Sequence, residues 1–320
     1  MAIRRFFLRS SLFYRNQVIA WSVTVLVYLL YVLSQAHKGF LVLLLPAVYL
    51  AATIWSICLS IHPRRHYIFR RYNPDHFGLK AEQITFYSKD GTRLSSWYIP
   101  GSSCQAIILV HGLGSAGLAM AKHARMFAAA GYHVLLPDLR AHGNSEGDTI
   151  TDISGADDIL AAVDYLRTRS DGDVEGVAAL GISFGALAVL HAARQTDAIR
   201  AIVLESIGPA ALADHGGKPQ TLRRWITYPF NWLQYKIFDF MCGFEENKGV
   251  IESLRCIYPR PVMFISTGVS KERYFMRLFY KAARQPKSIW EVPRASHGIA
   301  LTVRSKEYRE RLLKFFGSPV

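Results

Sequence analysis

Acidic residues are missing from the first 71 residues of the chain, which contain no aspartate or glutamate but nine lysines and arginines. The whole chain of 320 residues has a formal net charge of +14, so the other 249 residues carry only +5. These basic residues flank apolar runs and form no stripe on a folded domain. A nucleic-acid-binding protein is therefore not expected.

Cysteine is scarce, and its spacing excludes two classes of protein. Cys58, Cys104, Cys242 and Cys256 have neither the spacing of a metal site nor the pattern of a disulfide framework. Free cysteines of this kind suit a reducing compartment.

Two long runs lack charged side chains altogether. Residues 16–37 and 39–63 contain no Asp, Glu, Lys or Arg, and about 20 helical residues cross a hydrocarbon core of about 30 Å. Backbone groups in lipid must be hydrogen-bonded within the segment. The pattern predicts a membrane anchor over residues 1–71, with transmembrane helices at about 16–36 and 40–61 that form a hairpin. The alternative is a signal peptide cleaved near Ala36, followed by a single anchor.

The basic residues around these runs predict an orientation. Four arginines precede the first run and four follow the second, whereas the loop between them holds only Lys38. The positive-inside rule predicts that the N-terminus and the domain after the anchor both face the cytoplasm.

The rest of the chain reads as one α/β domain. Residues 72–81 form a predicted linker, and residues 82–317 the domain. It begins with a hairpin whose strands flank the turn Asp90-Gly91. Apolar strand-like runs then alternate with helical stretches, which predicts a mostly parallel sheet with helices on both faces.

The alternation lapses over residues 208–254, a segment rich in aromatic residues. We expect an inserted helical cap over the carboxyl edge of the sheet, where ligands bind in open α/β folds. The alternative is an ordinary helical excursion that packs on the sheet.

The most informative motif is G-x-S-x-G at residues 181–185, between a strand-like run and a helix-like run. A strand and a helix that meet in so sharp a turn expose the central serine, Ser183. A serine hydroxyl in this position becomes a nucleophile when a base accepts its proton.

Further motifs occur in a fixed order around Ser183. His111-Gly112 follows one predicted strand, the run D-x-R-x-H-G-x-S at 138–145 follows the next, and His297-Gly298 precedes the last helix. Over about residues 80–316 the chain resembles the α/β-hydrolases. It is most similar to bacterial serine hydrolases of the serine-aminopeptidase and acylglycerol-lipase type.

The resemblance implies an α/β-hydrolase fold with Ser183 as nucleophile and His297 as base. It also implies an oxyanion hole made by the backbone N–H groups of Leu113 and Phe184, and a structural role for His142 in the adjoining loop. It implies no metal and no cofactor. Together with the anchor, it predicts an integral protein of a bacterial inner membrane.

The catalytic acid departs from the family's pattern. The family usually has G-x-x-D after the strand that ends near Ser266, but this chain has Lys271 in the fourth position. Two carboxylates are candidates: Glu272, one residue later, and Glu205, at the end of the preceding strand. A site without a functional acid is the third alternative.

These features predict a membrane-anchored serine hydrolase that cleaves an ester or thioester through an acyl-enzyme on Ser183. The aromatic segment and the nearness of lipid favour a small-molecule or lipid-like substrate with an acyl chain. An aminopeptidase is one alternative. The other is a non-enzymatic membrane scaffold or binding protein that retains the fold.

Overall fold

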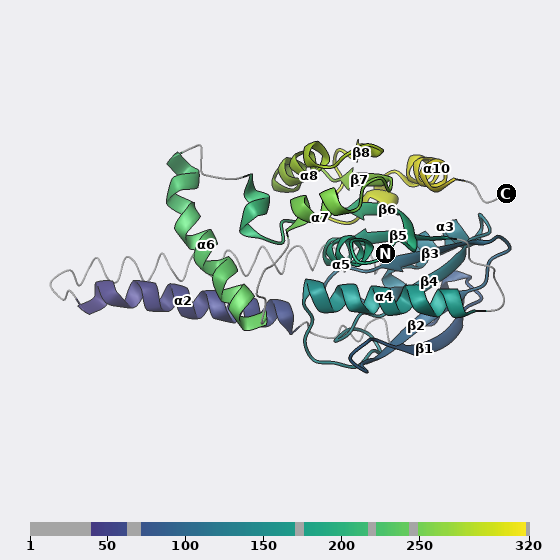
Figure 1. Cartoon of the computed structure of the whole chain (residues 1–320), viewed down its shortest axis with the longest axis horizontal. Coiled ribbons are helices and arrows are strands. Elements are labelled where there is room, and N and C mark those ends of the chain that lie inside the picture. Colours follow the sequence, from purple (N-terminus) through teal and green to yellow (C-terminus); the bar gives the residue numbers. More distant parts are fainter. Residues whose placement is uncertain (1–39, 63–71, 170–175, 217–221, 243–248, 318–320) are drawn as a thin grey trace. The chain divides into compact units, whose positions relative to one another are not determined.

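The computed structural model describes residues 40–62, 72–169, 176–216, 222–242 and 249–317, and the chain divides after Ile57 into two units. The first predicted membrane helix, at about 16–36, lies outside the described residues. The second coincides in its bounds with helix α2 (Phe40–Ile61) (Figure 1). Across the described ranges, no helix combines the length and apolarity needed to cross a membrane.

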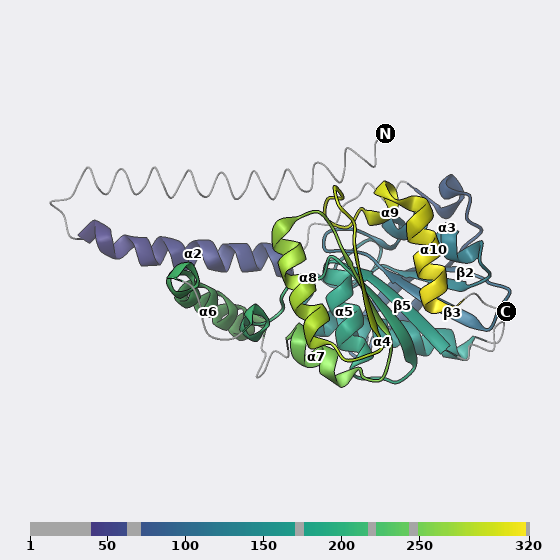
Figure 2. The same ribbon diagram turned by 90° about the horizontal axis from the view of Figure 1, so that it is seen from above.

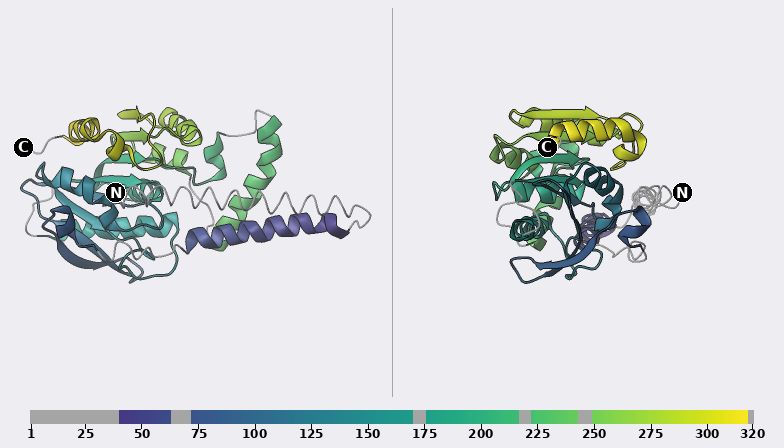
Figure 3. Two further views of the ribbon diagram at one scale, coloured as in Figure 1. Left: turned by 180° about the vertical axis from the view of Figure 1, so that it is seen from behind. Right: turned by 90° about the vertical axis from the view of Figure 1, so that its right-hand side faces the viewer.

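The second unit is built on a sheet of eight strands in the order β1-β2-β4-β3-β5-β6-β7-β8. The first two strands form the predicted antiparallel hairpin, and β2 is also antiparallel to β4. All other neighbouring strands are parallel, as predicted (Figure 3). The strands are β1 (Glu82–Tyr87), β2 (Arg93–Ile99), β3 (Gln105–Val110), β4 (His133–Pro137), β5 (Gly176–Ile182), β6 (Ile199–Glu205), β7 (Val262–Ser266) and β8 (Lys287–Glu291).

Helices cover both faces of the sheet (Figure 2). On one face α3 lies beside α10, where the rings of Phe127 and Phe316 are 5.7 Å apart. On the other face α4, α5, α7 and α8 contact one another in succession. The helices are η2 (Pro74–Phe77), η3 (Gly117–Met120), α3 (Ala121–Ala128), α4 (Asp152–Thr168), α5 (Phe184–Ala193), α7 (Val250–Cys256), α8 (Ser270–Ala282), α9 (Ala300–Val303) and α10 (Ser305–Phe316).

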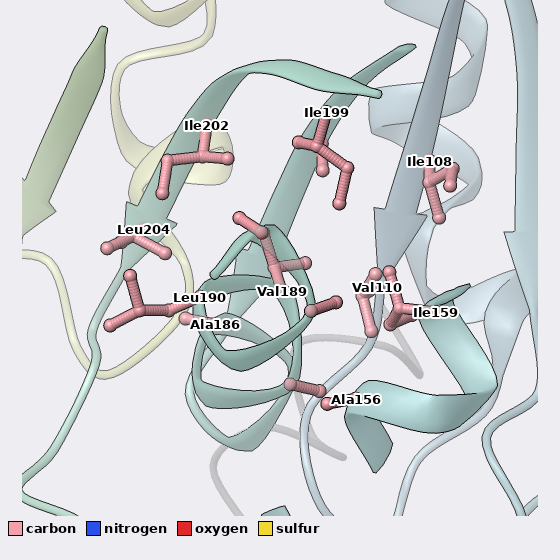
Figure 4. Packing of buried hydrophobic residues seen from close by; sticks show 14 of the residues in the cluster. Ile108, Val110, Ala156, Ile159, Ala186, Val189, Leu190, Ile199, Ile202 and Leu204 are labelled. Atoms are coloured by element: carbon pink, nitrogen blue, oxygen red, sulfur yellow. The ribbon is translucent and has the colours of Figure 1, made fainter. Parts of the chain in front are cut away.

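Helix α5 is held rigidly behind the G-x-S-x-G turn by the core. Figure 4 shows Val189 of α5 among Ile199 of β6, Val110 of β3 and Ala156 of α4, and all four are buried. Burial of a large aliphatic side chain contributes about 1.5–3 kcal/mol. The helix that begins at the turn therefore has little freedom to move.

The segment predicted as a cap is helical. It contains η4 (Leu212–His215), α6 (Leu222–Cys242) and α7, and residues 217–221 and 243–248 lie outside the described ranges. The buried carboxylate of Asp214 accepts hydrogen bonds from four backbone N–H groups that belong to the start and the end of the segment. The donors are Ala210, Ala211, Val250 and Ile251.

The two helices of this segment differ in their surroundings. Helix α7 contacts α5 and α8, so it belongs to the layer of helices on the sheet. Helix α6 instead exposes large aromatic side chains, including Trp225 at 60% and Phe240 at 87%. The aromatic residues that suggested a cap are concentrated in α6, and a cap over the carboxyl edge of the sheet stays a prediction.

Candidate active site

Ser183 occupies the turn between β5 and α5 with φ 57° and ψ −117°. A non-glycine residue in such a conformation carries about 1–3 kcal/mol of strain. The flanking glycines make the turn possible. A Cβ on Gly181 would overlap the backbone of Gly185, and a Cβ on Gly185 would lie 2.5 Å from the His111 carbonyl oxygen. The strained turn leaves Ser183 partly exposed at the carboxyl end of β5.

The loop after β3 lies beside this turn. A Cβ on Gly112 would be 3.5 Å from the Cβ of Ser183, so Leu113, the next residue, also belongs to the surroundings of the serine. Phe184 is the first residue of α5, and its backbone N–H is therefore one of the unpaired donors of a helix N-terminus. The two predicted oxyanion donors thus belong to the loop after β3 and to the first turn of α5, next to Ser183.

Buried histidines hold the loop after β3. The ring of His111 contacts the carbonyl oxygen of Gly112 through Nδ1 at 2.8 Å, and the N–H of Leu139 donates to Nε2 at 3.2 Å. These contacts require the proton on Nδ1. Burial lowers the pKa of His111 to about 4, so the ring is neutral at neutral pH.

His142 fastens the same loop from its other side. The N–H of Gly114 donates to Nε2 of His142 at 2.8 Å, and Nδ1 lies 2.8 Å from the carbonyl oxygen of Arg140. The His142 ring is fully buried and lies 4.9 Å from the ring of His111. Its contacts fit the structural role that the resemblance implies.

Glu272 and His297 meet directly. The Oε2 atom of Glu272 lies 2.9 Å from Nδ1 of His297. The side chain of Glu272 is 6% exposed, whereas that of His297 is 51% exposed. The acid is thus buried behind the ring, and the histidine is accessible from solvent.

The second oxygen of Glu272 is held by three donors. Oε1 accepts from the backbone N–H of Thr267 at 2.6 Å, from the Thr267 hydroxyl at 2.7 Å and from the Ser206 hydroxyl at 3.1 Å. Burial acts to raise the pKa of Glu272, but the hydrogen bonds from His297 and Thr267 outweigh it and hold the pKa below its ordinary value. Glu272 is therefore ionised at neutral pH and can stabilise a protonated His297.

Glu205 has different partners. Its carboxylate is completely buried and accepts from the N–H of Ala300 at 3.1 Å and from the Tyr308 hydroxyl at 2.7 Å. Burial raises its pKa to about 7. Of the two acids that the sequence left open, the structure brings Glu272, and not Glu205, to the ring of His297.

The loop that carries His297 lies against the Ser183 turn. Gly298 has φ 66°, and a Cβ there would be 2.8 Å from Cγ2 of Ile182, the residue before Ser183. The N–H of Gly268, after β7, donates to the carbonyl oxygen of Ala295 at 2.8 Å. The structure therefore gathers Ser183, His297 and Glu272 at the carboxyl ends of β5, β8 and β7.

Known proteins resemble this chain in sequence. Residues 101–245 match the family model described as serine aminopeptidase, S33. The uncharacterized protein YfhR of Salmonella typhimurium is 35% identical over 282 residues, which cover 81% of this chain and 90% of YfhR. The alpha/beta hydrolase domain-containing protein WAV2 of Arabidopsis thaliana is 26% identical over 237 residues, 70% of this chain and 74% of WAV2. The chain belongs to the α/β-hydrolases.

Solved structures of other α/β-hydrolases share the fold of this hydrolase. An esterase of Pyrococcus furiosus has a TM-score of 0.62 at 23% identity and covers 79% of this chain and 98% of its own. An esterase from a Rhodococcus species has a TM-score of 0.56 at 16% identity and covers 74% of this chain and 99% of its own.

Two polar residues of this hydrolase escaped the sequence-based prediction. Ser206 and Thr267 directly follow β6 and β7 and bind the carboxylate of Glu272. Ser206 also accepts the N–H of Gly298 at 3.1 Å and has φ 56°. The available signal was a hydroxyl residue directly after each of the strands β6 and β7.

We expect the variant His142→Phe to loosen the loop after β3. Phenylalanine keeps an aromatic ring but removes the acceptor for Gly114 N–H, and loss of such a hydrogen bond costs about 0.5–1.5 kcal/mol. Hydrogen exchange measured by mass spectrometry should become faster over residues 112–117. The exposed His76, whose ring bonds to Asn73, provides the control variant His76→Phe. Unchanged exchange in His142→Phe would contradict the role assigned to the ring.

Proposed function

We propose that this hydrolase cleaves an ester or thioester through an acyl-enzyme on Ser183. The observation that carries the proposal is the contact of 2.9 Å between His297 Nδ1 and Glu272 Oε2, beside a strained and accessible Ser183. A nucleophile needs a base, and the base needs a group that orients it. Glu272 is the group that orients His297.

In the first step, Oγ of Ser183 attacks the carbonyl carbon of the substrate while Nε2 of His297 takes the hydroxyl proton. Glu272 accepts the hydrogen bond from Nδ1–H and stabilises the imidazolium that forms. The developing oxyanion is bound by the N–H groups of Leu113 and Phe184. Loss of one such donor typically lowers the rate about 10²–10³-fold.

The tetrahedral intermediate collapses when His297 returns its proton to the leaving alcohol or thiol. Water then enters, loses a proton to His297 and attacks the acyl carbon. The second intermediate expels Ser183 Oγ, which regains its proton from His297. The cycle consumes one water and leaves a carboxylic acid with an alcohol or a thiol.

A small or lipid-like acyl substrate is supported by helix α6, which exposes Trp225, Trp232 and Phe240. Aromatic side chains of this kind provide apolar surface for an acyl chain. The segment that contains α6 is, in this proposal, the cap of the site. The description of the matching family as serine aminopeptidase supports a peptidase as the second candidate, and assays with aminoacyl amides beside acyl esters separate the two.

We further propose that residues 1–71 anchor the hydrolase in a bacterial inner membrane, with the catalytic domain in the cytoplasm. The support comes from the sequence alone, from the two uncharged runs and the arginines around them.

Labelling with a fluorophosphonate should modify Ser183. The probe phosphonylates an activated serine, so the wild type should be labelled and Ser183→Ala should not, with peptide mass spectrometry to locate the adduct. The exposed Ser102, in the loop before β3, provides the control variant Ser102→Ala, which keeps the proposed nucleophile. A folded wild-type protein that stays unlabelled would refute the serine mechanism and favour a scaffold or binding protein.

Replacement of the proposed acid should lower kcat strongly. Glu272→Gln removes the charge that stabilises the imidazolium, and loss of the acid in known triads lowers kcat about 10⁴-fold. Glu291→Gln, which breaks only a surface ion pair with Arg277, should keep wild-type rates of ester hydrolysis. Equal rates in the two variants would exclude Glu272 as the acid.

Membrane anchoring can be tested by fractionation and reporter fusion. The full chain should sediment with membranes after carbonate extraction, and a variant that starts at residue 72 should not. A C-terminal alkaline phosphatase fusion should be inactive, because this reporter needs an oxidising compartment. An active fusion would reverse the proposed orientation.

A further inference from the structure

The end of β6 is hydrogen-bonded to the Ser183 turn and to the loop that follows His297. The carbonyl oxygen of Glu205 accepts the N–H of Ser183 at 2.8 Å, and its carboxylate accepts the N–H of Ala300 at 3.1 Å. Ser206, the next residue, accepts the N–H of Gly298 at 3.1 Å. Two consecutive residues therefore hold the serine backbone and the loop just after His297.

The carboxylate of Glu205 is fixed in turn by helix α10. The Tyr308 hydroxyl donates to Oε2 of Glu205 at 2.7 Å, and both side chains are fully buried. A buried carboxyl group destabilises a fold unless it is hydrogen-bonded. An apolar side chain in this place would avoid that penalty but could not accept the N–H of Ala300.

We propose that Glu205 and Tyr308 form a buried positioning pair, which holds the His297 loop in register with the Ser183 turn. The inference rests on the proposed function, because it assigns the pair to the alignment of nucleophile and base. Displacement of a reacting group by about 1 Å can lower the rate about 10²-fold.

The charge of the pair adds a second effect. Burial raises the pKa of Glu205 to about 7 against the lowering effect of the hydrogen bonds from Tyr308 and Ala300, and the charges of Glu272 and His297 act in opposite directions on it. Tyr308 faces Glu205 from α10, and His123 of α3 packs against the Tyr308 ring at 5.5 Å. An ionised Glu205 therefore stabilises the imidazolium form of His297, and this contribution appears as the pH rises through about 7.

The raised pKa of Glu205 also makes the stability of the folded state depend on pH. The folded state holds a proton on Glu205 that the unfolded chain releases near its ordinary pKa of about 4.3. The contribution of this group to stability is fully present below that pH and is lost as the pH rises through about 7. Glu205→Gln should remove this part of the pH dependence.

Two variants of the full chain test the pair, and a third controls for them. Tyr308→Phe removes one hydroxyl from the pair. Glu205→Gln keeps an acceptor for Ala300 but cannot ionise. The control is Tyr132→Phe, since Tyr132 is equally buried and its hydroxyl donates to the Gly317 carbonyl oxygen at the other end of α10. The readouts are hydrogen exchange over residues 298–303 and kcat for a soluble p-nitrophenyl ester from pH 5 to 9.

We expect Tyr308→Phe to speed exchange in this segment about 10-fold and to lower kcat about 10–100-fold, with KM nearly unchanged. The ratio of wild-type kcat to that of Glu205→Gln should be near one below pH 6 and about 3–10 above pH 8, with its midpoint near pH 7. Tyr132→Phe should match the wild type in both readouts.

The results that would overturn the positioning pair differ from those that would overturn the proposed function. An active wild type with unchanged exchange and kcat in Tyr308→Phe, or with a pH-independent ratio for Glu205→Gln, would overturn the positioning pair alone. A wild type that neither hydrolyses the ester nor reacts with a fluorophosphonate would overturn the proposed function. Faster exchange in the variants of such an inactive protein would leave the pair a purely structural one and overturn its positioning role.

Discussion

The strained backbone of Ser183 is the constraint on which the rest of the site depends. A residue with φ 57° and ψ −117° relaxes unless its neighbours fix it. Here β5 on one side and the buried helix α5 on the other prevent relaxation, and glycines at 181 and 185 allow the approach of the backbone. The apolar core beneath α5 therefore keeps the hydroxyl group of Ser183 exposed.

The two carboxyl groups of the site have different partners, and their pKa values differ for that reason. Glu272 is held ionised by the three donors on its inner oxygen and by the ring of His297. Complete burial moves the pKa of Glu205 in the opposite direction, although Ala300 and Tyr308 donate to its carboxylate. Groups of the same chemical type thus have pKa values shifted in opposite directions within one site, as is common where chemistry depends on proton transfer.

Much of this arrangement could be predicted from the sequence because its signals are local. The turn at Asp90-Gly91 and the alternation of strands and helices gave the sheet, and G-x-S-x-G gave the position of Ser183. The choice between Glu272 and Glu205 could not be predicted. It depends on how the first turn of α8 and the loop after β8 meet in space, and no spacing along the chain encodes that meeting. Ser206 and Thr267 were missed for the same reason.

The position of Glu272 within α8 has a consequence for how such chains are classified. The acid lies in the first turn of the helix, one residue beyond the aspartate position of the G-x-x-D pattern that the family resemblance implies, and its side chain is longer than aspartate by one methylene group. The extra length offsets the shift along the backbone, so the carboxylate still meets His297. A survey that requires an aspartate at position 271 would count this protein among the pseudoenzymes, whereas a survey by carboxylate position in space would not.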